Sequence, residues 1–196
     1  SAVTVNSTDG DITFDSTINS DGTARALTLT AGTGTITLAN TAGTAANSTN
    51  RLASLTITSA STGNLANVFT TGAQTFSADA IALAGATSLG ATTATFNGEL
   101  NGGSLEITGN AVFNALVGNT TALGSLSVSG TTALNGDGTN PMTVTTTGSQ
   151  TYTGAVTLAD STTLSGGAIN LDGGASSSGA GLFKVANADA LSIANG

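Results

Sequence analysis

Few residues of this chain could take part in chemistry. Its 196 residues include eleven carboxylates but no histidine or cysteine, and its three basic residues are Arg25, Arg51 and Lys184. Without histidine to activate a serine, and with Lys184 as the only amine base, nucleophilic catalysis lacks its usual base. A thiolate metal site and a disulfide framework are excluded because cysteine is absent.

A metal ion would have to be held by oxygen ligands, which favours calcium. The segment NGDGTN (135–140) carries side-chain oxygens at alternate positions, on Asn135, Asp137 and Thr139. The pattern faintly resembles a calcium loop but lacks the bidentate glutamate that closes one. These three residues therefore form either a calcium site or an ordinary polar corner. We expect the corner, and no other cofactor.

Hydrolysis of polysaccharides would need clustered carboxylates, and lysine or arginine often helps to hold an acidic sugar. A coiled chain could bring Asp137 beside Asp160 or Glu106, but these acids are far apart in the sequence and basic residues are scarce. We therefore predict that the chain is not an enzyme.

The composition limits the partners. Charged residues make up 7% of the chain, the net charge is −8, and hydrophobic residues make up 39%. This apolar content is enough for a folded core. The negative charge argues against nucleic acid and anionic membranes as partners, because both attract basic patches. No apolar run approaches the roughly 20 residues of a membrane-spanning helix, so we expect no membrane insertion.

Short alternating segments predict strands throughout the chain. Examples are AVTV (2–5), TITL (35–38), SLTIT (54–58) and SLSVS (125–129), in which apolar residues alternate with threonine or serine. Glycine, asparagine or aspartate separates these segments, as corners require. Apolar residues do not recur at helical spacing, so the fold class predicted is all-β.

The spacing of the segments indicates one coil per repeat. Apolar residues at equivalent places in their segments recur at a nearly regular interval: Ile12, Ile36, Ile57, Ile81, Leu105 and Leu126. An all-strand sequence with a period of roughly 20–25 residues predicts a parallel β-helix, or β-solenoid. We expect roughly eight coils in a single domain over residues 1–196, with an irregular stretch at 174–190. Equivalent apolar residues then stack inward in ladders.

A longer repeat overlies the coils. TGAQTF (71–76) matches TGSQTY (147–152), residues 79–98 match 154–173, and residues 48–59 match 119–130. The three matches share nearly the same offset along the chain, which predicts a module of about three coils.

The aromatic side chains and the corner asparagines also have predicted places. We expect inward stacking of Phe14, Phe76, Phe96, Phe113 and Tyr152, because each alternates with threonine, alanine or asparagine. Asparagines at successive corners are predicted to stack in ladders along the rod.

Three segments resemble a known family: 10–38, TALGSLSVSGTTALNG (121–136) and VTTTGSQTYTGAVTLADSTTLSG (144–166). They are similar to the strand-repeat region of filamentous-haemagglutinin-like giant bacterial surface adhesins, exoproteins of the two-partner secretion type. The resemblance covers most of the chain and weakens after about residue 174. It implies a right-handed parallel β-helix, export to the cell surface, and a stalk or fibre role in cell adhesion or biofilm. No catalytic residue carries over.

Three functions remain open. The first is a non-catalytic stalk or fibre segment of an extracellular or cell-surface adhesin, whose neighbours are adjacent repeats. The second is a filament subunit that stacks end to end with copies of itself. The third is an adhesion module for host or surface glycans or proteins, with residues 176–190 around Lys184 as the place to look.

Overall fold

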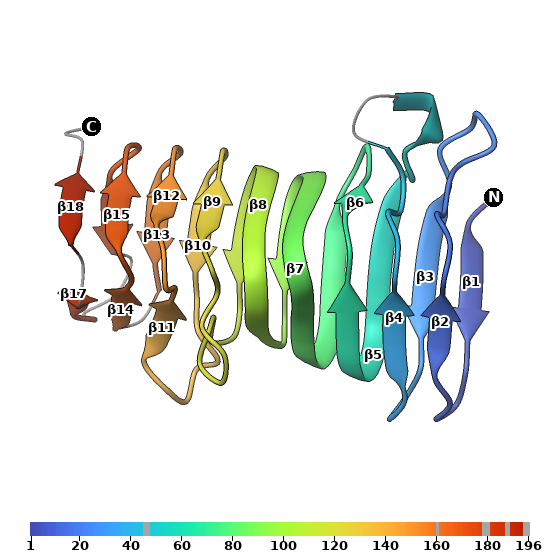
Figure 1. The fold of residues 1–196 in the computed structure, drawn as a ribbon, viewed down its shortest axis with the longest axis horizontal. Coiled ribbons are helices and arrows are strands. Elements are labelled where there is room, and N and C mark those ends of the chain that lie inside the picture. The colour runs from blue at the N-terminus through green and yellow to red at the C-terminus, as the bar shows by residue number, and fades with distance from the viewer. Residues whose placement is uncertain (45–47, 160, 178–180, 187–188, 194–196) are drawn as a thin grey trace.

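Parallel strands wind along one axis in the computed structural model, which describes residues 1–44, 48–159, 161–177, 181–186 and 189–193. All sixteen strand pairings in the described residues are parallel. The chain is a parallel β-solenoid of about nine turns, with its termini at opposite ends of the rod (Figure 1). The all-β solenoid predicted from the sequence is confirmed, with about nine turns in place of roughly eight.

Each turn visits three strand faces, which we number in chain order. Face 1 contains β1 (Val3–Asn6), β3 (Ala26–Thr30), β10 (Thr132–Leu134), β13 (Val156–Leu158) and β16 (Ala175–Ser177). Face 2 contains β2 (Ile12–Phe14), β4 (Thr35–Leu38), β11 (Met142–Thr145), β14 (Thr162–Ser165) and β17 (Phe183–Ala186). Face 3 contains β6 (Val68–Phe69), β9 (Leu126–Val128), β12 (Gln150–Tyr152), β15 (Ala168–Leu171) and β18 (Ala190–Ile193).

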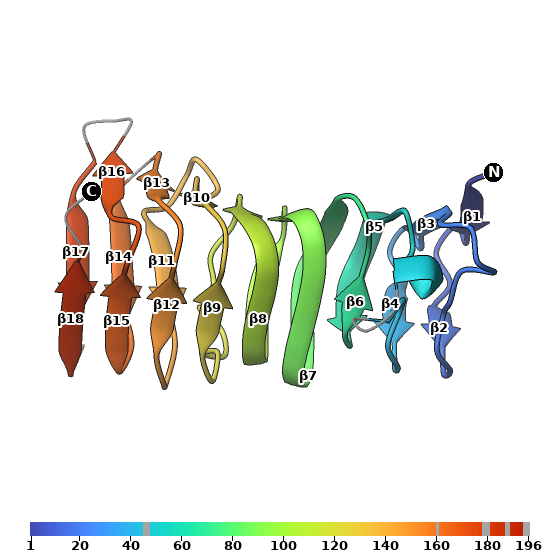
Figure 2. The same ribbon diagram turned by 90° about the horizontal axis from the view of Figure 1, so that it is seen from above.

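Three long strands continue around corners in the middle of the rod. They are β5 (Ser54–Leu65), β7 (Gln74–Phe96) and β8 (Glu99–Phe113), and each contributes to more than one face (Figures 1 and 2). A single turn of 3-10 helix, η1 (Ser48–Asn50), lies on a loop that projects from the rod. No helix in the described part of the chain is long and apolar enough to cross a membrane.

One inward column runs through all nine turns on each face. The face 1 column is Val5, Leu29, Ile57, Phe76, Phe96, Phe113, Leu134, Leu158 and Ser177. The face 2 column is Ile12, Ile36, Gly63, Ile81, Leu100, Val117, Val144, Leu164 and Val185. The face 3 column is Ile18, Ala42, Val68, Leu89, Ile107, Val128, Tyr152, Leu171 and Ile193.

Most members of these columns belong to the hydrophobic core. Strand burial alternates with a period of two, as in β4, where Ile36 and Leu38 are buried and Thr35 and Thr37 are only partly so. Inward apolar residues therefore stack on the turn below, while outward threonine keeps strand geometry and leaves a hydroxyl toward the surface. The predicted inward ladders are confirmed.

The residues predicted to share one column in fact lie on three faces. Ile12 stacks on Ile36 on face 2, but Ile57 belongs to face 1 and Leu105 stacks on Leu126 on face 3. The interval between these apolar residues did not identify one column, because the number of residues in a turn is not constant. The turn that leads from Phe96 to Phe113 is much shorter than the turn from Leu27 to Leu55.

The three-coil repeat is likewise displaced by one face. Gln74 pairs with Leu55 on face 1, whereas its counterpart Gln150 pairs with Leu126 on face 3. Residues 48–59 and 119–130 differ in the same way, since they supply the strands on which these two glutamines stack. The repeat therefore preserves local corner and strand structure, while the second copy starts one face away from the first.

The stretch predicted to be irregular, 174–190, contains β16 and β17. These strands pair in register with β13 and β14 of the preceding turn. The described part of this stretch is thus a further turn of the solenoid.

Candidate functional site

The calcium candidate lies in the loop between β10 and β11. Asp137 Oδ1 accepts hydrogen bonds from the backbone nitrogens of Thr139 (2.8 Å) and Asn140 (2.7 Å), and its Oδ2 accepts one from Asn140 Nδ2 (2.9 Å). These bonds hold the pKa of Asp137 below its ordinary value, because they stabilise the ionised form. Both carboxylate oxygens serve the loop itself, as in a polar corner.

Asn135 belongs to a different structure, an asparagine ladder beside the face 1 column. Asn135 Nδ2 donates to Asn114 Oδ1 (2.8 Å), Asn114 Nδ2 to Asn97 Oδ1 (2.7 Å), and Asn97 Nδ2 to Ser77 Oγ (2.9 Å). The predicted corner ladder is thereby confirmed. It crosses four successive turns, and each amide joins its turn to the next.

The ladder borders a polar recess at the corner between faces 1 and 2. Its lining includes Ser77, Asp79, Asn97, Glu99, Asn119 and Asp137, and its volume is about 510 Å³. The recess brings Asp137 near Asn97, which stands two turns earlier in the asparagine ladder than Asn135. The described residues hold no group of three or more histidine, cysteine, aspartate or glutamate side chains spaced to bind a metal ion.

Glu99 is a second acid of this recess whose carboxylate is bonded within the fold. Burial raises its pKa, but hydrogen bonds to Oε1 from Thr120 Oγ1 (2.7 Å), Thr120 N (3.0 Å) and Asn101 Nδ2 (3.0 Å) outweigh burial and lower it overall. Glu99 is therefore an ionised structural acceptor that ties one turn to the next.

The other acids weighed for catalysis lie elsewhere. Glu106 is on face 3, where its Oε2 accepts a hydrogen bond from Ser88 Oγ (3.3 Å), while Asp137 is in the loop between faces 1 and 2. The structure does not bring these two acids together. Asp160 lies outside the described residues.

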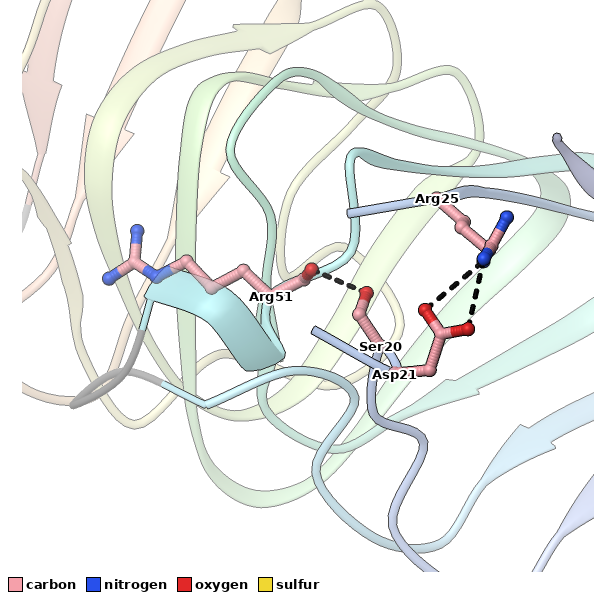
Figure 3. Close-up of polar contacts among 4 residues, drawn as sticks. All are labelled: Ser20, Asp21, Arg25 and Arg51. Atoms are coloured by element: carbon pink, nitrogen blue, oxygen red, sulfur yellow. Dashed lines mark hydrogen bonds and ion pairs between the residues drawn. The ribbon is translucent and has the colours of Figure 1, made fainter. Parts of the chain in front are cut away.

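Two of the basic residues are close to the first turns (Figure 3). Arg25 forms a two-bond ion pair with Asp21, with Nη2–Oδ2 at 2.9 Å and Nε–Oδ1 at 3.3 Å, and this lowers the pKa of Asp21. The Arg51 carbonyl accepts a hydrogen bond from Ser20 Oγ (2.7 Å), and its side chain extends away from the Asp21–Arg25 pair. The Arg51 guanidinium lies 5.9 Å from the centroid of the Phe69 ring.

Two buried glutamines, far apart along the rod, have structural roles that the sequence analysis missed. Gln74 Nε2 donates to the carbonyls of Val68 (3.0 Å) and Gly90 (3.0 Å). Gln150 Nε2 donates to the carbonyls of Val144 (3.1 Å) and Ser165 (2.9 Å). Each amide therefore fastens a corner to the turn above it. The sequence signal for this role is the glutamine that TGAQTF and TGSQTY share. The sequence analysis used these two segments only as evidence of a repeat.

The five aromatic residues predicted to lie inward do so, but on three different faces, with Phe14 on face 2. Phe76, Phe96 and Phe113 stack at centroid separations of 5.2 and 5.0 Å on face 1. Tyr152 is fully buried in the face 3 column, and Phe14 in the first turn is partly exposed. The three phenylalanine rings therefore contribute to packing and are not a surface for sugar stacking.

The two end turns carry the largest exposed apolar side chains. These are Val3 in the first turn and Leu182, Phe183, Leu191 and Ile193 in the last. β1 pairs with β3 alone and β18 with β15 alone among the described strands, so each end presents unpaired strand edges. The end surfaces are therefore candidate sites of interaction.

Comparison with known proteins adds no family. No family model matches the chain, and neither a curated protein nor a solved structure matches it.

Proposed function

We propose that the chain is a structural, non-catalytic segment of a stalk or fibre belonging to a bacterial cell-surface or extracellular adhesin or biofilm filament. The observation that carries the proposal is the continuity of the three inward columns through all nine turns. Residues that could do chemistry instead hold the fold together. Glu99 and the asparagine ladder join successive turns, and Asp137 holds its own loop.

What such a chain provides is a long, stable rod. Each turn buries the apolar face of the turn before it and adds one strand spacing, about 4.8 Å, to the rod. Stability then grows with the number of turns, because each contacts only its neighbours. The resemblance to filamentous-haemagglutinin-like strand repeats supports this role, and with it a right-handed winding and export to the cell surface.

A glycan-binding module is the second candidate, favoured by one observation. The polar recess offers amides and carboxylates of the kind that bind sugar hydroxyls, including Asn97, Asn119 and Glu99. A stalk segment is favoured because most of these groups are already bonded within the ladder and the loops.

Surface display tests the stalk role. The chain is inserted between an outer-membrane anchor and a terminal epitope, and is compared with a version that lacks one full turn, residues 97–113. This deletion joins Phe96 to Asn114 and keeps the register, because Phe96 and Phe113 occupy the same position of successive turns. Electron microscopy is expected to show rods, shortened by about 4.8 Å for the deleted turn.

A glycan array tests the alternative with the isolated chain. No selective capture is expected, because the polar groups of the recess are engaged in the fold. Compact particles by electron microscopy, or selective glycan capture that is lost in Asn97→Ala, would overturn the stalk proposal.

A further inference from the structure

Both ends of the described rod expose apolar side chains at positions that are buried in the other turns. Four of their exposed apolar side chains occupy inward positions, because their partners one turn further in are buried. The pairs are Val3 with Leu27, Phe183 with Thr162, Leu191 with Ile169, and Ile193 with Leu171. Val3, Leu191 and Ile193 are 46%, 48% and 50% exposed. In the described chain no further turn covers them.

The first turn also has an apolar hollow. A cavity of about 310 Å³ is lined by Val3, Val5, Phe14, Ile18 and Leu27, among others. Leu191 and Ile193 at the opposite end of the rod are inward side chains of the size that such a hollow accepts. The first turn thus offers an apolar hollow, and the last turn offers apolar side chains that could fill it.

The strand registers define how two ends would meet. The columns place Ile193 as the last member and Ile18 as the first on face 3. They place Val185 last and Ile12 first on face 2. A turn added after the last one, in unbroken register, therefore sets Ile12 beside Val185 and Ile18 beside Ile193.

This register also pairs opposite charges. Lys184 directly precedes Val185, and Asp11 directly precedes Ile12, so stacking brings Lys184 beside Asp11. Both residues are exposed. Asp11 is held in place by Thr35 N, which donates to its Oδ1 at 2.8 Å. Lys184 is one of only three basic residues in a chain of net charge −8, and it lies in the last turn.

We propose that a second copy of this chain binds the end of the rod, head to tail and in register, so that Lys184 of one copy contacts Asp11 of the next. This rests on the proposed function, since it assigns a partner to the same fibre segment. The strand edges supply backbone hydrogen bonds, the inward side chains supply apolar contact, and the charge pair selects direction and register.

Disulfide trapping tests the register in the full chain, which has no cysteine of its own. Thr4 and Ser176 are outward neighbours of the face 1 column, at the first and last turns. In-register stacking places their Cα atoms roughly 5 Å apart, within the range of about 4.4–6.8 Å found for disulfides. The Thr4→Cys, Ser176→Cys double variant is expected to form a ladder of linked multimers on mild oxidation. The control, Thr4→Cys with Thr108→Cys, is expected to form no disulfide-linked ladder, because Thr108 lies in the middle of the rod.

Sedimentation at increasing concentration tests the contacts, at about 0.15 M salt, where the Debye length is about 8 Å. Lys184→Glu and Ile193→Asn are each expected to weaken association about tenfold. Asp11→Asn keeps an acceptor for Thr35 and is expected to rescue part of the Lys184→Glu loss. Thr108→Glu, an added charge in the middle of the rod, is expected to leave association unchanged.

The outcomes separate the two proposals. Monomers at every concentration, or equal cross-linking by both cysteine pairs, would overturn end-to-end stacking. If those monomers are still rods by electron microscopy, the stalk role stands. Compact particles would overturn both.

Discussion

Tyr152 Oη donates a hydrogen bond of 3.0 Å to Gln150 Oε1 in the interior of the solenoid. At the equivalent place in the other copy of the motif, phenylalanine stands in the position of tyrosine, and Gln74 Oε1 is buried without a hydrogen-bond donor among the described residues. One hydroxyl therefore decides whether the amide oxygen of the corner glutamine is satisfied. Burial also raises the pKa of Tyr152, so the hydroxyl stays protonated and keeps donating.

Removing this hydroxyl is expected to destabilise the rod. Tyr152→Phe leaves Gln150 Oε1 unpaired and should lower the free energy of unfolding by about 1–3 kcal/mol. Phe76→Tyr is the reciprocal change, because it offers Gln74 Oε1 a donor, and a gain of about 1 kcal/mol is expected. Urea denaturation of both variants measures these values. A loss of stability in Phe76→Tyr would contradict the view that a tyrosine hydroxyl at this position can donate to the neighbouring glutamine oxygen.

The free energy of unfolding should fall in proportion to the number of asparagine-ladder hydrogen bonds that a substitution removes. Asn114→Ala deletes two ladder bonds, at 2.7 and 2.8 Å, whereas Asn135→Ala deletes one. At about 0.5–1.5 kcal/mol for each hydrogen bond, Asn114→Ala is expected to cost about twice as much as Asn135→Ala. Chemical denaturation of the two variants side by side checks the ratio. Equal costs would mean that the ladder bonds do not act separately.

Close stacking of turns requires glycine at some corners. A Cβ at Gly98 would collide with the Ala78 carbonyl oxygen of the previous turn, while a Cβ at Gly85 would meet nothing within 4 Å. Gly98→Ala is therefore expected to cost about 1–3 kcal/mol through overpacking. Gly85→Ala should be neutral or stabilise by up to about 1 kcal/mol, since it restricts the unfolded chain. Thermal unfolding of both variants is the measurement; similar melting temperatures would refute the close contact.

Acid should weaken the fold through its bonded carboxylates. The pKa of Glu99 in the folded chain lies below its ordinary value of 4.5, so its stabilising effect is present above pH 4.5 and is lost as the pH falls through the folded pKa. The free energy of unfolding is thus expected to decrease on acidification below about pH 5. Glu99→Gln should flatten this acid limb in part, because Asp21 and Asp137 also have lowered pKa values. An unchanged slope would show that the bonds to Thr120 and Asn101 do not favour the ionised form.

Local features of the fold were predictable from the sequence. Alternation of apolar residues with threonine marked strands such as β4, because burial in a strand has a period of two. Glycine and asparagine marked corners, and the nearly regular interval between apolar residues of successive segments indicated coils. Inward packing of Phe96 and the amide ladder through Asn114 followed from the same logic, because stacked coils place like residues at corresponding positions of successive turns.

The assignment of residues to faces was decided only in three dimensions. The inward sites of the three faces accept the same apolar residues, so a corner that gains or loses a few residues moves a segment to another face without any change in its strand pattern. Ile57 therefore stacks on Phe76 and not on Ile81, and the repeated glutamine motif occupies face 1 in one copy and face 3 in the other. The same winding set Lys184 and Asp11 at matching positions of opposite ends of the rod, although almost the whole chain separates them.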